Sequence, residues 1–318
     1  MKIMITGGLG FIGTTFTKFI LDTTPHTVAL IDKMTYAFNH YWWEPENHLP
    51  YGPRFHLYQD DVFNANTNDW PTDVDVIVHF AAETHVDNSI GKAAPFIHTN
   101  VVGTHKLLEY AKAINVGKFV YISTDEVYGC TSLRSKRLFK ETDKLCPNNP
   151  YSATKAAGEH LCMSYWHTFG VPIVITRSCN NYGPFQHREK LIPTVIRSIK
   201  EGKPIPVYGK GKNIREWIPV EENSRAILEV FYHGQVGAAY NIGSGWRLKN
   251  LDLIKLITRY LGKGKIQFVT DRLGHDLRYA LDASKIESEL GFKCLNEYEC
   301  ERYLENTIDW YWRRKYYD

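Results

Sequence analysis

The sequence lacks the features that mark membrane, secreted and nucleic-acid-binding proteins. No apolar run approaches the roughly eighteen residues of a membrane helix. The 6 cysteines are far apart and form no C-x-x-C pair, so they indicate reduced thiols rather than a disulfide framework or a metal site. The 38 basic and 35 acidic residues leave a formal charge of +3, too small and too scattered for a nucleic-acid surface. We therefore expect a cytoplasmic protein without a membrane partner, a nucleic-acid partner or a metal.

What the chain does have is 318 residues, 43% of them hydrophobic, which is enough for a large buried core. Short β-rich runs alternate with one-sided helical stretches, a pattern typical of βαβ units. This predicts an α/β fold with a Rossmann-type, doubly wound parallel sheet and a smaller C-terminal lobe. The expected strands are 2–6, 27–31, 55–58, 74–79, 118–122 and 172–176, and the expected helices are 11–21, 104–113 and 153–169.

The sequence changes character after residue 178, where loops rich in Asn, Gly, Pro and Arg are separated by shorter helices. We expect residues 1–178, with return segments near 220–242, to form the sheet domain, and residues 179–318 to form mainly the smaller lobe. Loop-dense sequence of this kind is suited to binding a ligand. The prediction for the lobe is loops at 180–186, 202–212, 243–247 and 271–276.

A glycine-rich loop follows the first expected strand and leads into a helix. Glycines let the backbone turn tightly and approach a pyrophosphate, whose charge is met by amide N–H groups at the helix start. An acid closes the second strand, where it can accept from the adenosine ribose and disfavour a 2′-phosphate, so we predict NAD rather than NADP. The expected contacts are Gly7, Gly10, Phe11, Ile12, Gly13 and Asp32.

Two further pairs of residues come directly after strands. Asp61 and Val62 follow the third strand, and Ala81 and Ala82 follow the fourth. The carboxyl ends of parallel strands line the crevice of a doubly wound sheet. We expect these residues to contact the adenine and the nicotinamide half of the cofactor.

Tyr151 and Lys155 are four residues apart, which places both side chains on one side of a helix. A nearby ammonium and a cationic nicotinamide ring favour the phenolate, so the phenol is predicted to be a base around neutrality. It would take the proton of a substrate alcohol that is held by Thr124.

Asp125 and Glu126 lie side by side after the strand at 118–122. Two carboxylates in a closed site repel each other, so their pKa values should split and leave one acid protonated. Once a sugar carbon is oxidised to a ketone, the neighbouring C–H becomes acidic and a hydroxyl one carbon further on can leave. We assign Glu126 as the base and Asp125 as the acid of that elimination.

Each motif also has a purely structural interpretation. The glycines can form a tight turn without a ligand, and the Tyr and Lys can be incidental on a surface helix. Two acids after a strand can cap the following helix. The combination of all three motifs in one chain favours the catalytic interpretation.

The segments that carry the chemistry are 7–13, 81–87, 123–129, 151–155, 177–184, 189–193 and 271–276. Over nearly its whole length the chain resembles the extended short-chain dehydrogenase/reductases, most closely the dTDP-glucose 4,6-dehydratases. The resemblance implies that Tyr151 and NAD oxidise glucose at C4, Glu126 removes the C5 proton and Asp125 assists loss of water from C6. Hydride then returns to C6, which gives a 4-keto-6-deoxy-glucose still attached to its nucleotide and regenerates NAD.

The same resemblance implies the remaining contacts. Thr99 and Asn181 would help to hold the cofactor. The nucleoside-diphosphate-glucose would be bound by Thr84, His85, Thr124, Asn180, Lys190, Leu191, Pro206, Tyr208, Arg215, Asn250, Arg272 and His275. Independently of the resemblance, Arg215 and Arg272 can pair with diphosphate oxygens in a bidentate fashion, although either could also be a solvated surface residue.

Other functions stay open at this point. UDP-glucose 4,6-dehydratases share the character of residues 83–89, and one methyl group on the base is worth only about 1–3 kcal/mol of discrimination. Glu222-Asn223 also departs from the Asp-His that the family often has. A 4-epimerase would need Tyr151 and Lys155 but not the two acids, and a dinucleotide-sensing module would need no catalysis. The resemblance implies a homodimer through the helices at 104–113 and 153–169, although packing inside one subunit would explain their apolar faces as well.

Overall fold

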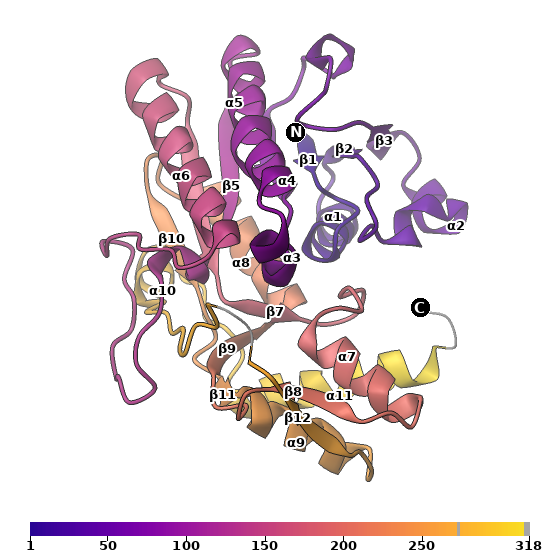
Figure 1. Ribbon diagram of the computed structural model, residues 1–318. Helices are drawn as coiled ribbons and strands as arrows, with labels where there is room; N and C mark the ends of the chain where they lie inside the picture. The colour runs from indigo at the N-terminus through magenta and orange to yellow at the C-terminus, as the bar shows by residue number, and fades with distance from the viewer. Residues whose placement is uncertain (272–273, 315–318) are drawn as a thin grey trace.

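Seven strands form one parallel sheet in the order β3-β2-β1-β4-β5-β6-β10, which confirms the predicted α/β fold. The computed structural model describes residues 1–271 and 274–314 (Figure 1). The strands are β1 (Lys2–Thr6), β2 (Thr27–Asp32), β3 (Phe55–Gln59), β4 (Val76–His79), β5 (Lys118–Thr124), β6 (Ile173–Ser178) and β10 (Ala239–Ile242). The six strands expected from the sequence are all present, with ends that differ by at most two residues.

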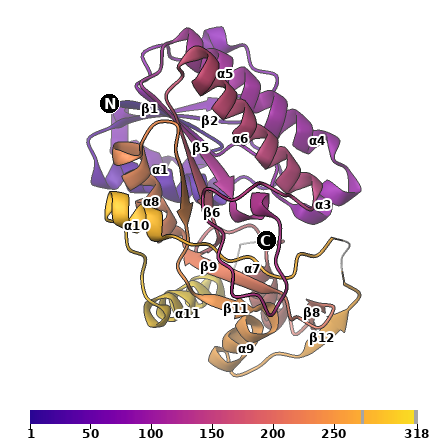
Figure 2. The same cartoon turned by 90° about the vertical axis from the view of Figure 1, so that its left-hand side faces the viewer.

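Helices cover both faces of the sheet (Figure 2). Along β1, Ile3 and Ile5 belong to the core cluster that contains residues of α1 and α8, whereas Met4 belongs to the cluster with residues of α5 and α6. Successive side chains of a strand point to opposite faces, so each face has its own core. The covering helices are α1 (Phe11–Thr23), α8 (Val220–His233) and α10 (Ser284–Leu290) on the first face, and α3 (Val86–Gly91), α4 (Ala94–Ile97), the π-helix η4 (His98–Gly103), α5 (Thr104–Ala113) and α6 (Pro150–Phe169) on the second.

Short elements occupy the connections around the large sheet. They are the 3-10 helices η1 (His40–Trp43), η2 (Leu49–Arg54), η3 (Thr67–Asp69) and η5 (Asp125–Tyr128), and the single-turn helix α2 (Pro45–His48). In the described part of the chain, no helix is both long enough and apolar enough to cross a membrane.

A smaller lobe lies at the carboxyl ends of the large sheet and has a core cluster of its own (Figures 1 and 2). Its strands form a three-stranded sheet, β11-β9-β7, and a two-stranded sheet, β12-β8. The elements are β7 (Asn180–Tyr182), α7 (Leu191–Lys200), β8 (Ile205–Tyr208), β9 (Ile214–Pro219), β11 (Arg247–Lys249), α9 (Asn250–Tyr260), β12 (Ile266–Val269) and α11 (Glu297–Arg313).

The expectation of plain loops at 180–186 and 202–212 is therefore wrong, because β7 and β8 lie within them. These strands have only 3 and 4 residues, too few for a clear alternating pattern. The alternation is visible in β8 once its partner is known, because Ile205 and Val207 are buried while Pro206 and Tyr208 are exposed. Strand β10 returns to the large sheet beside β6, and the predicted domain division at residue 178 stays a prediction.

The order of the strands reverses between β1 and β4, which lie next to each other in the sheet. At such a point the connections leave in opposite directions and open a crevice outside the carboxyl ends of the strands. The crevice therefore lies where the glycine loop, the end of β4 and the end of β5 meet.

Candidate active site

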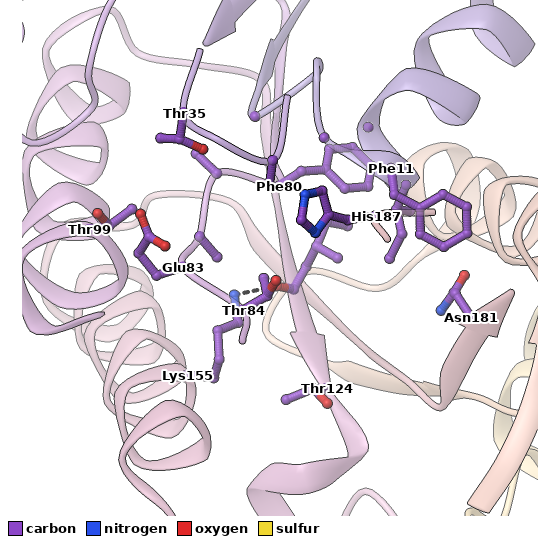
Figure 3. A pocket seen from close by; sticks show the side chains of 18 of the residues that line it. Phe11, Thr35, Phe80, Glu83, Thr84, Thr99, Thr124, Lys155, Asn181 and His187 are labelled. Carbon is purple, nitrogen blue, oxygen red and sulfur yellow. Dashed lines mark hydrogen bonds between the residues drawn. The ribbon is translucent and has the colours of Figure 1, made fainter. Parts of the chain in front are cut away.

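One cavity of about 300 Å³ lies at this crevice, between the large sheet and the segment that precedes α7 (Figure 3). All residues predicted to bind the cofactor line it, as do all residues predicted to be catalytic. They are Gly7, Gly10, Phe11, Ile12, Gly13, Asp32, Asp61, Val62, Ala81, Ala82, Thr99, Thr124, Asp125, Glu126, Tyr151, Lys155 and Asn181.

The glycine loop needs its glycines for close backbone approach. Gly7 has φ +71°, and a Cβ there would lie 2.4 Å from the main-chain nitrogen of Ala81. A Cβ on Gly13 would lie 2.3 Å from the carbonyl oxygen of Gly7. Helix α1 begins after Gly10, its first residues line the cavity, and no side-chain cap competes for the N–H groups of its first turn. This is the arrangement that a pyrophosphate requires.

Asp32 ties the loop to the end of β2. Its carboxylate accepts hydrogen bonds from the main-chain N–H of Leu9 (3.0 Å) and of Met34 (2.8 Å). Burial raises the pKa of Asp32, and these two bonds oppose the rise. Each carboxylate oxygen has a second lone pair, so the group can also accept from ribose hydroxyls.

Two amides on the opposite side of the cavity each have one unpartnered acceptor. Asn181 donates to the carbonyl of Cys179 (3.0 Å), and Gln186 donates to the carbonyl of Asn181 (2.8 Å). These bonds fix the amide orientations and leave Asn181 Oδ1 and Gln186 Oε1 buried without a protein partner. Buried acceptors of this kind call for a donor from a ligand, and the carboxamide of NAD has the required N–H groups. The cavity therefore fits NAD at both ends.

Tyr151 and Lys155 are positioned by the start of α6. Asn149 caps the helix through a capping box and Pro150 is its first residue, so Tyr151 lies in the first turn and Lys155 one turn later. Lys155 Nζ donates to the carbonyl of Ile122 at 2.6 Å. Burial lowers the pKa of Lys155 to about 8.

The pKa of Tyr151 in the protein without cofactor lies above its ordinary value, so the ammonium alone does not produce the lowering expected from the sequence. Burial is the largest cause and Glu126 adds to it, while a hydrogen bond with Thr124 acts in the opposite direction. The cost of burying the phenolate thus exceeds the effect of the nearby ammonium. A cationic nicotinamide would provide the positive charge that is still needed.

The two adjacent acids have different surroundings. Asp125 is 2% exposed, and its Oδ2 has no hydrogen-bond partner. Burial raises its pKa well above the ordinary value, with further contributions from Glu126 and Glu216. Its other oxygen accepts from the Thr124 hydroxyl at 3.3 Å. Burial and the two neighbouring carboxylates therefore favour the protonated form of Asp125.

Glu126 is only partly buried and has polar partners. Its Oε2 accepts from Asn149 Nδ2 at 3.4 Å and from the hydroxyl of Tyr279 at 3.5 Å. The structural interpretation of the two acids holds in part, because they lie in the first turn of η5 and Thr124 caps it. Capping does not explain why Asp125 is buried in the cavity without a partner for one oxygen.

The predicted substrate contacts divide into two groups. Thr84, Thr124, Asn180 and Lys190 line the cavity. Lys190 Nζ donates to the carbonyl of Thr84 at 3.2 Å. The others do not line it, and Arg272 lies outside the described residues. Those outside the lining are His85, Leu191, Pro206, Tyr208, Arg215, Asn250 and His275.

Arg215 shows why sequence motifs do not fix this second group. Its guanidinium donates to the carbonyls of Ile214 (2.9 Å) and Asp276 (2.9 Å) and lies 4.4 Å from the ring centre of Tyr279. The side chain is thus buried within the lobe. His275 is bonded to the carboxylate of Asp271 at 2.6 Å.

The cavity also has lining residues that the sequence did not single out as site residues. Figure 3 shows Thr35, Phe80, Glu83 and His187 around it. Lys33 approaches Glu83 at 3.6 Å and donates to Thr99 at 3.3 Å. Among residues 1–271 and 274–314, no three metal-ligating side chains gather.

The comparisons with known proteins agree on the family of this chain. Residues 4–307 match the family described as GDP-mannose 4,6 dehydratase. The low-salt glycan biosynthesis protein Agl12 of Haloferax volcanii is 45% identical over 98% of each chain. The dTDP-glucose 4,6-dehydratase of Salmonella typhimurium is 41% identical, over 98% of this chain and 92% of its own length.

Solved structures give the same result. DesIV, a dTDP-glucose 4,6-dehydratase from Streptomyces venezuelae with NAD and TYD bound, superposes with a TM-score of 0.90 at 40% identity and covers 98% of this chain and 97% of its own. A UDP-glucuronic acid 4-epimerase from Bacillus cereus superposes with a TM-score of 0.89 at 30% identity, over 98% and 99% of the two chains. The chain therefore belongs to the GDP-mannose 4,6-dehydratase family, as one of its NAD-dependent nucleotide-sugar 4,6-dehydratases.

Proposed function

We propose that this protein is a dTDP-glucose 4,6-dehydratase that forms a 4-keto-6-deoxy-glucose on its nucleotide. The observation that carries the proposal is Asp125, a buried acid with one unpartnered oxygen, next to Glu126 in the cavity that also contains Tyr151. Oxidation alone requires only Tyr151 and Lys155. An acid whose protonated form is favoured, beside a second carboxyl group, is what an elimination adds to that requirement.

The residues take the following roles in the proposal. Tyr151 accepts the C4 hydroxyl proton, with Thr124 holding the hydroxyl. Glu126 takes the C5 proton, and Asp125 gives its proton to the departing C6 hydroxyl, which leaves as water. NAD, when bound, supplies a hydride acceptor that later returns the hydride, so there is no net oxidation.

The thymidine preference rests on the dehydratase relatives, several of which act on dTDP-glucose by name at about 40% identity. Uridine is the first alternative. The test is to supply the purified, NAD-loaded protein with dTDP-glucose and UDP-glucose and to compare kcat/KM from the alkali absorbance of the 4-keto product. A higher kcat/KM for UDP-glucose would show that the preferred nucleoside is uridine rather than thymidine. Absence of product from both substrates would reject the dehydratase function.

A nucleotide-sugar 4-epimerase is the second candidate, favoured by the likeness to the Bacillus cereus epimerase structure. It would give a 4-epimer without alkali absorbance. Its chemistry gives no role to a protonated acid at Asp125, so the Asp125→Asn protein would keep full activity. A dinucleotide-sensing module would show no turnover of either nucleotide glucose.

The proposal includes a homodimer through α5 and α6 and a cytoplasmic site of action. The two helices pack against each other, and Phe169 at the end of α6 is 52% exposed while its ring lies 4.5 Å from Lys112 Nζ. An exposed aromatic ring at the end of a packed helix pair is suited to a partner surface. Sedimentation equilibrium would test this, and a monomer at micromolar concentration would reject it.

A further inference from the structure

Tyr121 lies against the side chain of Lys155. It is the fourth residue of β5 and is fully buried. The centre of its ring is 4.3 Å from Lys155 Nζ. The hydroxyl of Tyr121 donates to the main-chain carbonyl of Lys155 at 3.3 Å. The ring and the hydroxyl of one side chain thus contact the same lysine at its two ends.

The surroundings prevent this ring from moving away. A Cβ on Gly158 would lie 2.1 Å from the hydroxyl oxygen of Tyr121, so α6 approaches the ring more closely than any residue other than glycine permits. The ring of His79 is 5.7 Å from it on the neighbouring strand β4. The position of the Tyr121 ring is therefore fixed by backbone on one side and by the sheet core on the other.

Lys155 needs such a neighbour, because its ammonium is buried. The residue is 3% exposed, and one of its three N–H groups is used by the carbonyl of Ile122. Removing an ammonium from water is costly unless its charge is compensated. The face of an aromatic ring carries negative charge density, and a desolvated cation–π contact is among the stronger ones.

We propose that Tyr121 is a positioning residue, whose ring keeps the Lys155 ammonium charged and in place beside Tyr151. The inference rests on the proposed function, in which Lys155 supports the base of the oxidation step. Other charged or titratable groups also face the ammonium. Glu159 and Cys162 do so from α6, and His79 does so from β4.

None of these other groups replaces the ring. Glu159 is already paired with Arg177 at 2.6 Å, and His79 is held neutral beside Lys155, so it adds no compensating charge. Both remain unchanged when Tyr121 alone is substituted, so a change in the pKa of Lys155 would report on the ring.

The test substitutes Tyr121 by Leu and, separately, by Met, whose flexible side chain fills more of the ring space. Loss of the ring destabilises the charged form, so the pKa of Lys155 should fall below its value of about 8. We expect a fall of about one pH unit, the equivalent of a tenfold change in the protonation equilibrium. The alkaline limb of the kcat profile should move to lower pH by the same amount. Tyr121→Phe keeps the ring, so the alkaline limb of its kcat profile should lie at the wild-type pH.

A direct titration separates this inference from the proposed function. The ammonium signal of Lys155 can be followed by 15N NMR in the folded protein and assigned with Lys155→Met, without any turnover. Phe119→Leu is the matched control, since Phe119 is fully buried two residues away in the same core cluster. It should leave the titration of Lys155 unchanged.

The outcomes are distinct. If the folded Leu and Met proteins titrate at the wild-type pH, or lose activity equally at every pH, the positioning role is rejected. If the titration shifts but the wild-type protein converts no nucleotide-linked glucose, the proposed function fails and the role of Tyr121 stands. A shift of the same size in Phe119→Leu would show a general loss of packing and would also overturn the inference.

Discussion

The two sides of the cavity are built in different ways. The sheet side consists of the carboxyl ends of β1, β2, β4 and β5, together with the first turns of α1 and α6. The lobe side consists of short strands and connecting segments around β7 and α7. Every predicted cofactor or catalytic residue of the sheet side lines the cavity, whereas most predicted contacts of the lobe are not among its lining residues.

This difference follows from how each side is held. Parallel strands fix the position of the residue after each strand, because the hydrogen-bonded register places all carboxyl ends at one edge. In the lobe, Arg215 and His275 have intramolecular partners that a motif does not reveal. The sheet side therefore has its proposed cofactor contacts already assembled around the cavity, whereas most of the proposed substrate contacts of the lobe do not line it.

The largest effect is expected on the sheet side, from Tyr151→Phe. Loss of the phenol removes the base for the C4 hydroxyl, and general base catalysis of this kind contributes about 10³-fold. Turnover should fall by that factor while NAD binding is retained. Product absorbance in alkali and NAD affinity would be measured together, with Tyr165→Phe on the same helix as the control, since its hydroxyl bonds to Glu109 outside the cavity. A residual activity above a tenth of wild type would contradict the assignment.

The next effect separates the two acids, beginning with Asp125→Asn. The amide cannot give a proton to the leaving hydroxyl, so water loss should slow by about 10²-fold while oxidation at C4 survives. NADH should then accumulate on the enzyme during turnover, which its absorbance would show. An unchanged rate of dehydration would reject the acid role.

The Glu126→Gln substitution should affect a different step, the removal of the proton from C5. The variant lacks a carboxylate to take the C5 proton, so exchange of the C5 hydrogen with solvent deuterium should drop by about 10²-fold. Mass spectrometry of the recovered sugar measures that exchange. Near-normal deuterium incorporation would show that another group is the base.

The sequence predicted the sheet side well for a physical reason. Gly7, Asp32 and Tyr151 belong to motifs whose position relative to strands and helices is legible from local pattern, and β1 and α5 have the predicted bounds. The parallel sheet then brings these residues together. The family resemblance added the identity of the reaction, and the comparisons confirm that family.

What the sequence could not predict depends on contacts between distant residues. The raised pKa of Tyr151 reflects burial that only the folded cavity produces. Gln186 and Tyr121 carry no motif signal, because their importance comes from an unpartnered amide oxygen and from a ring placed under Lys155. Strands β7 and β8 are too short to be distinguished from loops before their partners are known.

A moderate, pH-dependent effect on folding stability is expected from His79, which lies at the end of β4 on the sheet side. His79 Nε2 donates to the hydroxyl of Thr104 (3.0 Å), which itself donates to Asn100, and His79 Nδ1 lies 2.7 Å from the hydroxyl of Thr6. Burial lowers the pKa of His79 to about 3 from an ordinary value of 6.5. The unfolded chain therefore binds a proton that the folded protein does not, and stability is lost as the pH falls below 6.5.

At pH 5 this loss should be about 2 kcal/mol, estimated from the 1.4 kcal/mol of each pH unit. Urea unfolding at pH 5 and pH 7 would measure it. His79→Gln keeps one donor and one acceptor but cannot titrate, so its stability should change less between the two pH values. His160→Gln, at an exposed position of α6, is the control and should behave as the wild type.

The smallest effect is expected on the lobe side, from Arg215→Lys. If the nucleotide diphosphate engages Arg215, lysine loses the bidentate geometry but keeps the charge, so KM for the nucleotide glucose should rise about tenfold with kcat nearly unchanged. Arg259→Lys on the exposed face of α9 is the matched control. If KM stays the same, Arg215 only anchors the segment around Asp276 through its present hydrogen bond. The lobe would then bind the nucleotide through other residues, and the contrast between the two sides of the cavity would be stronger than the family resemblance implies.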